Sequence, residues 1–162
     1  MMLKKEQIDQ VEPTIKTSKT ISYALIIGVL AATICLGAIA NWDNVNSALD
    51  ILPIVGIAIG VSHLFLAIFV PTLLVQNQLQ NIQSMDEELR LKKLAGLHQT
   101  QNIVRFALLE GAAFVNLILF FLTSNLILLG IVAGCLAAMA LAIPKTDAVL
   151  EWIADNLTSP KL

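Results

Sequence analysis

The stretch ILPIVGIAIGVSHLFLAIFVPTLLV, residues 51–75, decides the fold class. It contains no Asp, Glu, Lys or Arg, and His63 is its only ionisable side chain. A helix needs about 20 predominantly apolar residues to cross the hydrocarbon core of a bilayer. We therefore expect residues 51–75 to form a transmembrane helix.

Three further segments have the same character: residues 21–40, 103–122 and 126–143. The segment 103–122 contains Glu110, which costs about 2.5–3.5 kcal/mol at mid-membrane on the insertion scale for charged side chains. It also contains thirteen Ile, Leu, Phe or Val residues, whose favourable transfer sums to about 4–8 kcal/mol. The sequence thus predicts four spans.

Composition supports the same class. The chain has 162 residues, of which 57% are hydrophobic and 14% are charged, and its mean hydropathy is +0.79. This predicts an all-α membrane protein, a four-transmembrane-helix bundle in a lipid bilayer. A formal charge of −2 lacks the basic character of a nucleic-acid partner. Cys35 and Cys135 lie in apolar runs without C-x-x-C spacing, which predicts neither a metal nor a disulfide.

The positive charges are distributed unequally. Nine of the ten Lys and Arg residues lie before the first span, between the second and third, or after the fourth; Arg105 sits just inside the third span. The loops 41–50 and 123–125 carry none. Positive loops stay in the cytoplasm, so the sequence predicts a multi-pass protein of a bacterial cell membrane with both termini cytoplasmic.

The first apolar segment has an alternative interpretation. Lys16 and Lys19 before it, and Ala38-Ile39-Ala40 at its end, are also features of a cleavable secretory signal. The preceding stretch is long and acidic, however, and the apolar run has the length of a span. These features favour a membrane span.

The two halves resemble each other. YALIIG (23–28) aligns with FALLEG (106–111), and GIAIG (56–60) aligns with GIVAG (130–134). This predicts one membrane domain, 1–162, composed of hairpin repeat one (17–77), a cytoplasmic linker (78–97), hairpin repeat two (98–144) and an amphipathic tail (145–162). The alternative is chance agreement between apolar sequences.

The second alignment contains two G-x-x-x-G pairs, Gly56 with Gly60 and Gly130 with Gly134. Two glycines one turn apart let another helix backbone approach closely. We therefore expect spans two and four to make the central contact. The competing interpretation is that glycine is simply common in transmembrane helices.

Short amphipathic helices are expected on the cytoplasmic side. The residues SMDE (84–87) form a capping box, and Gly96 is a plausible stop. After Pro144, a helix beginning near Thr146 would place Val149, Trp152 and Ile153 on one face. Trp42 and Trp152 have the positions of interfacial anchors, and Arg105 is close enough to the headgroups to snorkel.

The polar residues inside the predicted spans are the candidate site. Glu110 and His63 lie at similar depth and could meet across the helix pair to carry a proton or a cation. The alternative is that Glu110 is neutral and hydrogen-bonds to His63 or a carbonyl as interhelical glue. His98, Asn102, Arg105 and Asn116 fall along one stripe of a helix, whose cytoplasmic end could receive a lipid phosphate or a partner loop, or simply be solvated.

ALLEGAA (107–113) and the apolar run after it resemble the proton-binding helix of the c subunits (proteolipids) of rotary ATP synthases. The resemblance implies that Glu110 is the ion-binding carboxylate and that Ile27 stands at the position that lost it. The whole chain is similar to small uncharacterised bacterial four-span membrane proteins with a comparable segment, a likeness that implies no activity.

No enzyme motif is present: the chain lacks G-x-S-x-G, a P-loop and H-E-x-x-H. We therefore expect no catalytic residues and no cofactor. The expected role is a non-enzymatic oligomerising or accessory subunit, with itself or another membrane protein as partner. The alternative is a proton- or cation-translocating subunit.

Overall fold

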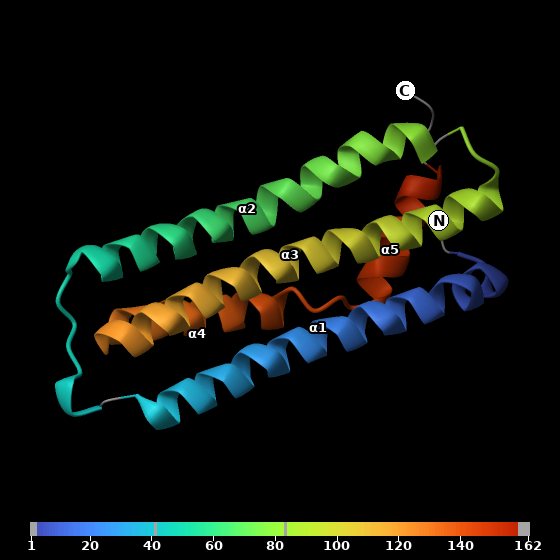
Figure 1. The fold of residues 1–162 in the computed structure, drawn as a ribbon. Helices are drawn as coiled ribbons and strands as arrows, with labels where there is room; N and C mark the ends of the chain where they lie inside the picture. Colours follow the sequence, from blue (N-terminus) through green and yellow to red (C-terminus); the bar gives the residue numbers. More distant parts are fainter. Residues whose placement is uncertain (1–2, 41, 83, 159–162) are drawn as a thin grey trace.

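The computed structural model describes residues 3–40, 42–82 and 84–158, which form a bundle of α-helices (Figure 1). The only β-type pairing in this part of the chain is an isolated bridge between Asn46 and Asn125. The all-α prediction is confirmed for these residues. The helices in chain order are α1 (Lys5–Ile39), the short 3-10 helix η1 (Trp42–Asn44), α2 (Ile51–Ile82), α3 (Glu87–Thr123), α4 (Leu126–Leu141) and α5 (Thr146–Thr158).

Three helices, α1, α2 and α3, are each long and apolar enough to cross a membrane. Helix α4 has only 16 residues, or about 24 Å at 1.5 Å per residue, less than the roughly 30 Å of a hydrocarbon core. It meets the same test only together with α5, from which it is bent by 64°. The structure thus has three candidate spans, or four if the bent pair crosses together.

Helix α3 occupies the centre of the bundle, and it contacts each of the other four α-helices. Figure 1 shows it lying between α1 and α2. The prediction that spans two and four make the central contact is therefore wrong. The reason lies in the sequence of α3, which buries apolar residues on several faces, among them Phe106, Leu109, Ala113 and Leu117.

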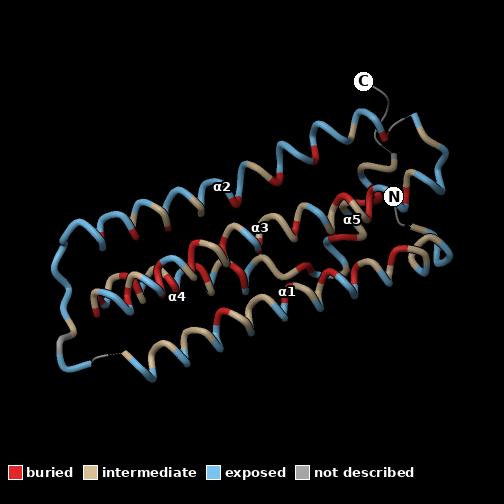
Figure 2. The backbone as a smooth tube through the Cα atoms, in the orientation of Figure 1, coloured by how far each residue is buried: buried red, intermediate tan, exposed pale blue. Residues whose placement is uncertain are grey.

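Two apolar clusters hold the bundle together. The first lies within the predicted spans and centres on Phe106, Leu109, Val132 and Met139, which are almost fully buried. Figure 2 shows such buried positions along α3 and α4, whereas the outer side of α2 is exposed. The exposed residues of the bundle include many large apolar side chains, such as Ile34 at 70%, Phe65 at 59% and Leu141 at 87%. Exposed apolar surface of this extent is compatible with a lipid environment.

The second cluster lies beyond the predicted spans except for Val75, at the end of the bundle that carries α5 and the start of α1, called here the α5 end. It joins the two ends of the chain to the middle: Val11 and Ile15 of α1, Leu91 and Leu94 of α3, and Val149 and Ile153 of α5 pack together. The three long helices are about 48–56 Å long at 1.5 Å per residue. Their surplus length over a bilayer forms this second cluster.

The expected short linker helix is part of α3. Gly96 does not end a helix, because α3 continues to Thr123. Its neighbours Ala95 and Leu97 are buried, and this packing outweighs the roughly 1 kcal/mol that a glycine costs in a helix interior. Ser84 does not cap the helix either; its hydroxyl donates to the carbonyl of Asn81 at 3.3 Å.

The opposite end of the bundle carries the α1–α2 connection and the α3–α4 turn. Ser124 adopts a left-handed conformation with φ 52° and ends α3. The amide of Asn46 donates to the carbonyl of Ser124 at 3.1 Å, and the amide of Leu126 donates to the carbonyl of Asn46 at 3.0 Å. This pairing ties the long connection to the tight turn.

Candidate functional site

A polar pocket of about 380 Å³ lies at the α5 end, where α4 stops and α5 begins, against one side of α3. It exists because α4 is short and the chain turns sharply after it. We call it the basic pocket. Its polar lining residues are His98, Gln101, Asn102, Arg105, Lys145 and Trp152, and its apolar wall includes Leu141, Ala142 and Ile143.

The charged side chains of the basic pocket are all cationic. Arg105 of α3 and Lys145 of the α4–α5 connection line it, and no carboxylate of a described residue does. In the described part of the chain, ion pairs join Lys16 to Glu12 and Lys92 to Glu88. Arg105 and Lys145 therefore have no carboxylate partner there.

Arg105 is held in place by a backbone carbonyl of α2 that has no hydrogen-bond partner within its own helix. Pro71 lies inside α2 and has no N–H, so the carbonyl four residues earlier, that of Ala67, loses its helical partner. The Nε of Arg105 donates to this carbonyl at 3.3 Å. The sequence places Pro71 and Arg105 in two predicted spans but gives no sign of this contact.

His98 lines the basic pocket beside Trp152 of α5. Its ring lies edge-on to that of Trp152, with 5.4 Å between the ring centroids. Burial, and then the positive charge of Arg105, lower the pKa of the His98 imidazole. His98 precedes the predicted span, and its contact with Trp152 places this tryptophan against α3.

Asn102 joins the pocket to α1. Its side-chain amide donates to the hydroxyl of Ser22 at 2.8 Å and to that of Ser18 at 3.3 Å, and all three residues are buried. Lys19 on the same helix donates to the hydroxyl of Thr146 at 2.7 Å. The sequence placed Asn102 on a polar stripe but missed the serines, although their spacing of four residues puts them on one helix face.

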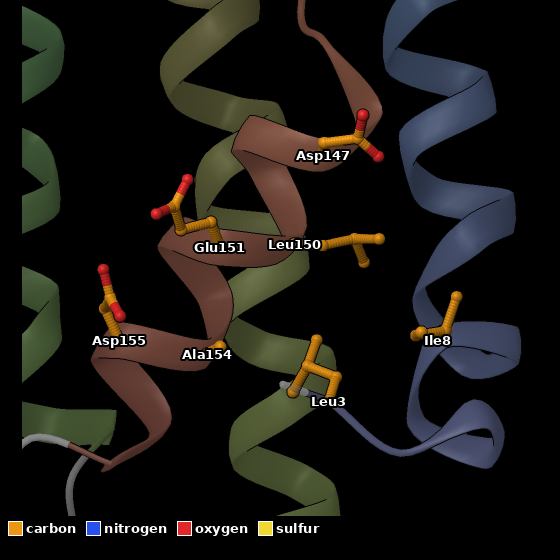
Figure 3. Close-up of a pocket in the computed structure, with 7 residues that line it drawn as sticks. All are labelled: Leu3, Ile8, Asp147, Leu150, Glu151, Ala154 and Asp155. Atoms are coloured by element: carbon orange, nitrogen blue, oxygen red, sulfur yellow. The ribbon is translucent and has the colours of Figure 1, made fainter. Parts of the chain in front are cut away.

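A second hollow, of about 490 Å³, lies on the other side of α5 and has the opposite charge. It is lined by Asp147, Glu151 and Asp155 together with apolar residues. Figure 3 shows Leu150 pointing toward Ile8 of α1, while Glu151 and Asp155 point away from α1. The acidic side chains of α5 are thus separated from the basic pocket.

The predicted pair of Glu110 and His63 is not joined by a hydrogen bond or an ion pair. A methyl group added at Gly28 would lie 3.9 Å from Oε1 of Glu110, so the carboxylate faces α1. The Nδ1 of His63 lies 3.0 Å from the carbonyl of Ile59 in its own helix. Among the described residues, nothing hydrogen-bonds to or forms an ion pair with Glu110.

The two glycine pairs have different surroundings. A methyl group at Gly56 would collide with Leu128 and one at Gly60 would lie 2.5 Å from Ile131, so the first pair is packed against α4. No described residue lies within 4 Å of such a group at Gly130 or Gly134, and both glycines are exposed. The first pair is used inside the bundle, and the second faces outward.

Asn116 lies beside the first glycine pair. It is fully buried, and its amide donates to the carbonyl of Ala112 at 2.9 Å. Its Oδ1 has no hydrogen-bond partner and lies 2.7 Å from the position of a methyl group at Gly56. Only glycine leaves room for this oxygen, which lies against the α2 backbone.

The predicted interfacial tryptophans lie at opposite ends of the bundle. Trp42 is 52% exposed, and its Nε1 donates to the carbonyl of Gly37 at 2.7 Å. Trp152 is partly buried beside His98. Aromatic residues near both ends of the apolar region are typical of membrane interfaces.

The arrangement offers anion binding at the basic pocket, helix packing at the outer face of α4 and an unpaired carboxylate near α1. Comparison with protein-family models, with curated proteins and with solved structures finds no significant match for this chain.

Proposed function

We propose that the protein is a non-enzymatic integral membrane subunit with four spans that self-associates through the outer face of α4. In this arrangement both termini lie in the cytoplasm, at the α5 end. The Lys and Arg residues outside the apolar segments support this orientation, because they fall in segments that meet at that end, and the opposite loops have none.

The contrast between the two glycine pairs carries the proposal. Gly56 and Gly60 already receive side chains of α4, whereas Gly130 and Gly134 have nothing within 4 Å. Ala137 continues the same exposed face one turn later. Small residues at this spacing let helix backbones come close in lipid, where packing rather than the hydrophobic effect drives association.

The partner is a second copy of this chain. A G-x-x-x-G face is self-complementary, because the same two glycines on each helix can face each other across a two-fold axis. Light scattering on protein extracted in a mild detergent tests the proposal. We expect the mass of a dimer or a larger oligomer. A strictly monomeric particle would contradict it.

Two variants sharpen the test. Gly134→Leu places a large side chain on the outer face of α4. It should convert the oligomer to a monomer and leave the bundle intact. Ala58→Leu makes a comparable enlargement at an exposed position of α2 and should leave the mass unchanged. If both variants dissociate the oligomer equally, the α4 face is not the interface. If the parent is monomeric but binds a different membrane protein that Gly134→Leu loses, the self-association proposed here is wrong.

A second candidate function rests on Glu110. Its carboxylate faces α1, and no described residue hydrogen-bonds to it or forms an ion pair with it. A carboxylate without a partner inside a membrane is costly and available for a proton or a cation. In vesicles, Glu110→Gln should abolish proton or cation flux and labelling by a carbodiimide. Equal flux and labelling in the variant and the parent would contradict translocation.

A further inference from the structure

The basic pocket holds more positive charge than the described residues neutralise. Arg105 is partly buried, and no carboxylate lines the pocket or pairs with it in the described part of the chain. The three acidic side chains of α5 that could have done so line the opposite hollow (Figure 3). Partly buried charge is costly unless it is paired, so the pocket favours an anion from outside the chain.

The groups in the pocket suit a phosphate. A guanidinium presents a planar fork of donors that matches phosphate oxygens, and a lysine ammonium adds a mobile point charge. The first turn of α5 forms part of the wall through Ala148 and Val149. Free backbone N–H groups at a helix N-terminus add to the positive potential there.

The apolar wall indicates that the anion carries a hydrocarbon chain. Leu141, the last residue of α4, lines the pocket and is 87% exposed. Helix α4 is about 24 Å long, so its end falls short of the full hydrocarbon thickness. A headgroup seated in the pocket would continue directly into the apolar surface of α4, and a soluble phosphate would leave Leu141 uncovered.

We propose that the basic pocket binds the phosphate of an anionic glycerophospholipid from the leaflet at the α5 end, between Arg105, Lys145 and the start of α5, with an acyl chain along α4. Trp152 lies in the same pocket at the level of the headgroups, where tryptophan is common. The lipid fills the indentation left by the short helix and supplies the missing negative charge.

The fluorescence of Trp152 is a direct probe of lipid binding in the basic pocket. The chain has two tryptophans, so Trp42→Phe leaves Trp152 as the only one. In uncharged detergent micelles, this protein is titrated with dioctanoyl phosphatidylglycerol, dioctanoyl phosphatidylcholine or inorganic phosphate, and Trp152 fluorescence is followed. We expect a saturable change with phosphatidylglycerol at concentrations at least tenfold lower than with phosphatidylcholine, and no saturation with inorganic phosphate in the same range.

Three variants distinguish lipid binding in the basic pocket from general electrostatic attraction to the protein surface. Lys145→Gln alters an exposed side chain that makes no hydrogen bond with another described residue, and it should weaken phosphatidylglycerol binding about tenfold. Arg105→Gln should weaken it further. Lys93→Gln removes the same charge from an exposed position that lines a different cavity and should change binding less than twofold.

Three results would overturn the proposal. Equal affinity for the two lipids would mean that the negative charge is not recognised. Saturation by inorganic phosphate as readily as by phosphatidylglycerol would make the ligand a soluble anion. A loss with Lys93→Gln as large as with Lys145→Gln would mean diffuse electrostatic attraction to the surface.

Discussion

The side chain of Asn125 reaches across the bundle end to Asn46: its amide donates to Oδ1 of Asn46 at 3.0 Å. The same amide donates to the carbonyl of Ala48 at 2.7 Å, while its Oδ1 accepts from the backbone N–H of Ile127 at 3.0 Å. Asn125 therefore caps α4 and also fixes the α1–α2 connection.

Removing this side chain should destabilise the bundle. Asn125→Ala loses the cap, worth about 1 kcal/mol, and two hydrogen bonds at about 1 kcal/mol each, so we expect a loss of about 2–3 kcal/mol. Asn125→Ser retains a good cap without the reach to Asn46 and should lose about 1 kcal/mol less. Unfolding in mixed micelles with increasing dodecyl sulfate measures both. Unchanged stability in Asn125→Ala would mean that this contact does not stabilise the bundle.

The apolar segments could be predicted from the sequence, whereas the contacts between them could not. Hydropathy identified the positions of all four apolar helices, because the signal lies in each segment itself. The central position of α3 depends on which helix faces pack against each other. The sequence of a uniformly apolar helix gives little information about which of its faces does so. Likewise, the opposite surroundings of Gly56 and Gly130 could not be read from two identical motifs.

Part of the basic pocket could be predicted from the sequence. Three members of the predicted stripe, His98, Asn102 and Arg105, line the pocket, whereas Asn116 does not. A lipid phosphate as the ligand stays a prediction. The pocket itself depends on the bend after α4 and on Lys145, which come from a distant part of the chain. The charge of Glu110 makes it a candidate site residue. The charge alone gives no indication that the side chain faces α1 rather than His63.

Gly56→Ala should destabilise the fold, because the new methyl group would collide with Leu128 and meet Asn116 at 2.7 Å. Overpacking of this kind costs about 1–3 kcal/mol. Gly96→Ala is the matched control: nothing lies within 4 Å of its new methyl group. It should stabilise the protein by up to about 1 kcal/mol, because Gly96 lies inside a continuous helix. The same micelle unfolding measures both, and destabilisation by Gly96→Ala would contradict an unbroken α3.

Pro71 and Arg105 should be energetically coupled. Pro71→Ala provides an N–H for the carbonyl of Ala67, so this carbonyl no longer needs the Nε of Arg105. Arg105→Met should therefore cost less in the Pro71→Ala background than in the parent, by about 0.5–1.5 kcal/mol. A double-mutant cycle on the free energy of unfolding measures the difference. Strictly additive effects would show that the contact contributes nothing.

The docking of α5 should weaken in acid because of His98. Its pKa is lowered in the folded protein by burial and by Arg105, so the folded state disfavours the imidazolium. The charged residues near the ring in the basic pocket are Arg105 and Lys145, and the small cavity on its other side is lined by no charged residue besides His98. Every neighbouring charge thus opposes protonation.

For a group whose folded pKa is depressed, the stabilising contribution is complete above the unfolded value and is lost as the pH falls below it. The usual histidine pKa is about 6.5, so we expect the loss to begin as the pH falls through about 6.5 and to continue down to the lower pKa of His98 in the folded protein. The parent should lose more stability over this interval than His98→Gln, which cannot titrate, while the carboxylates contribute equally to both. In the Trp42→Phe background, the fluorescence of Trp152 should report the loosening of α5 directly, because its ring lies against His98. Identical pH profiles for the parent and His98→Gln would show that the contact between α3 and α5 is insensitive to this charge.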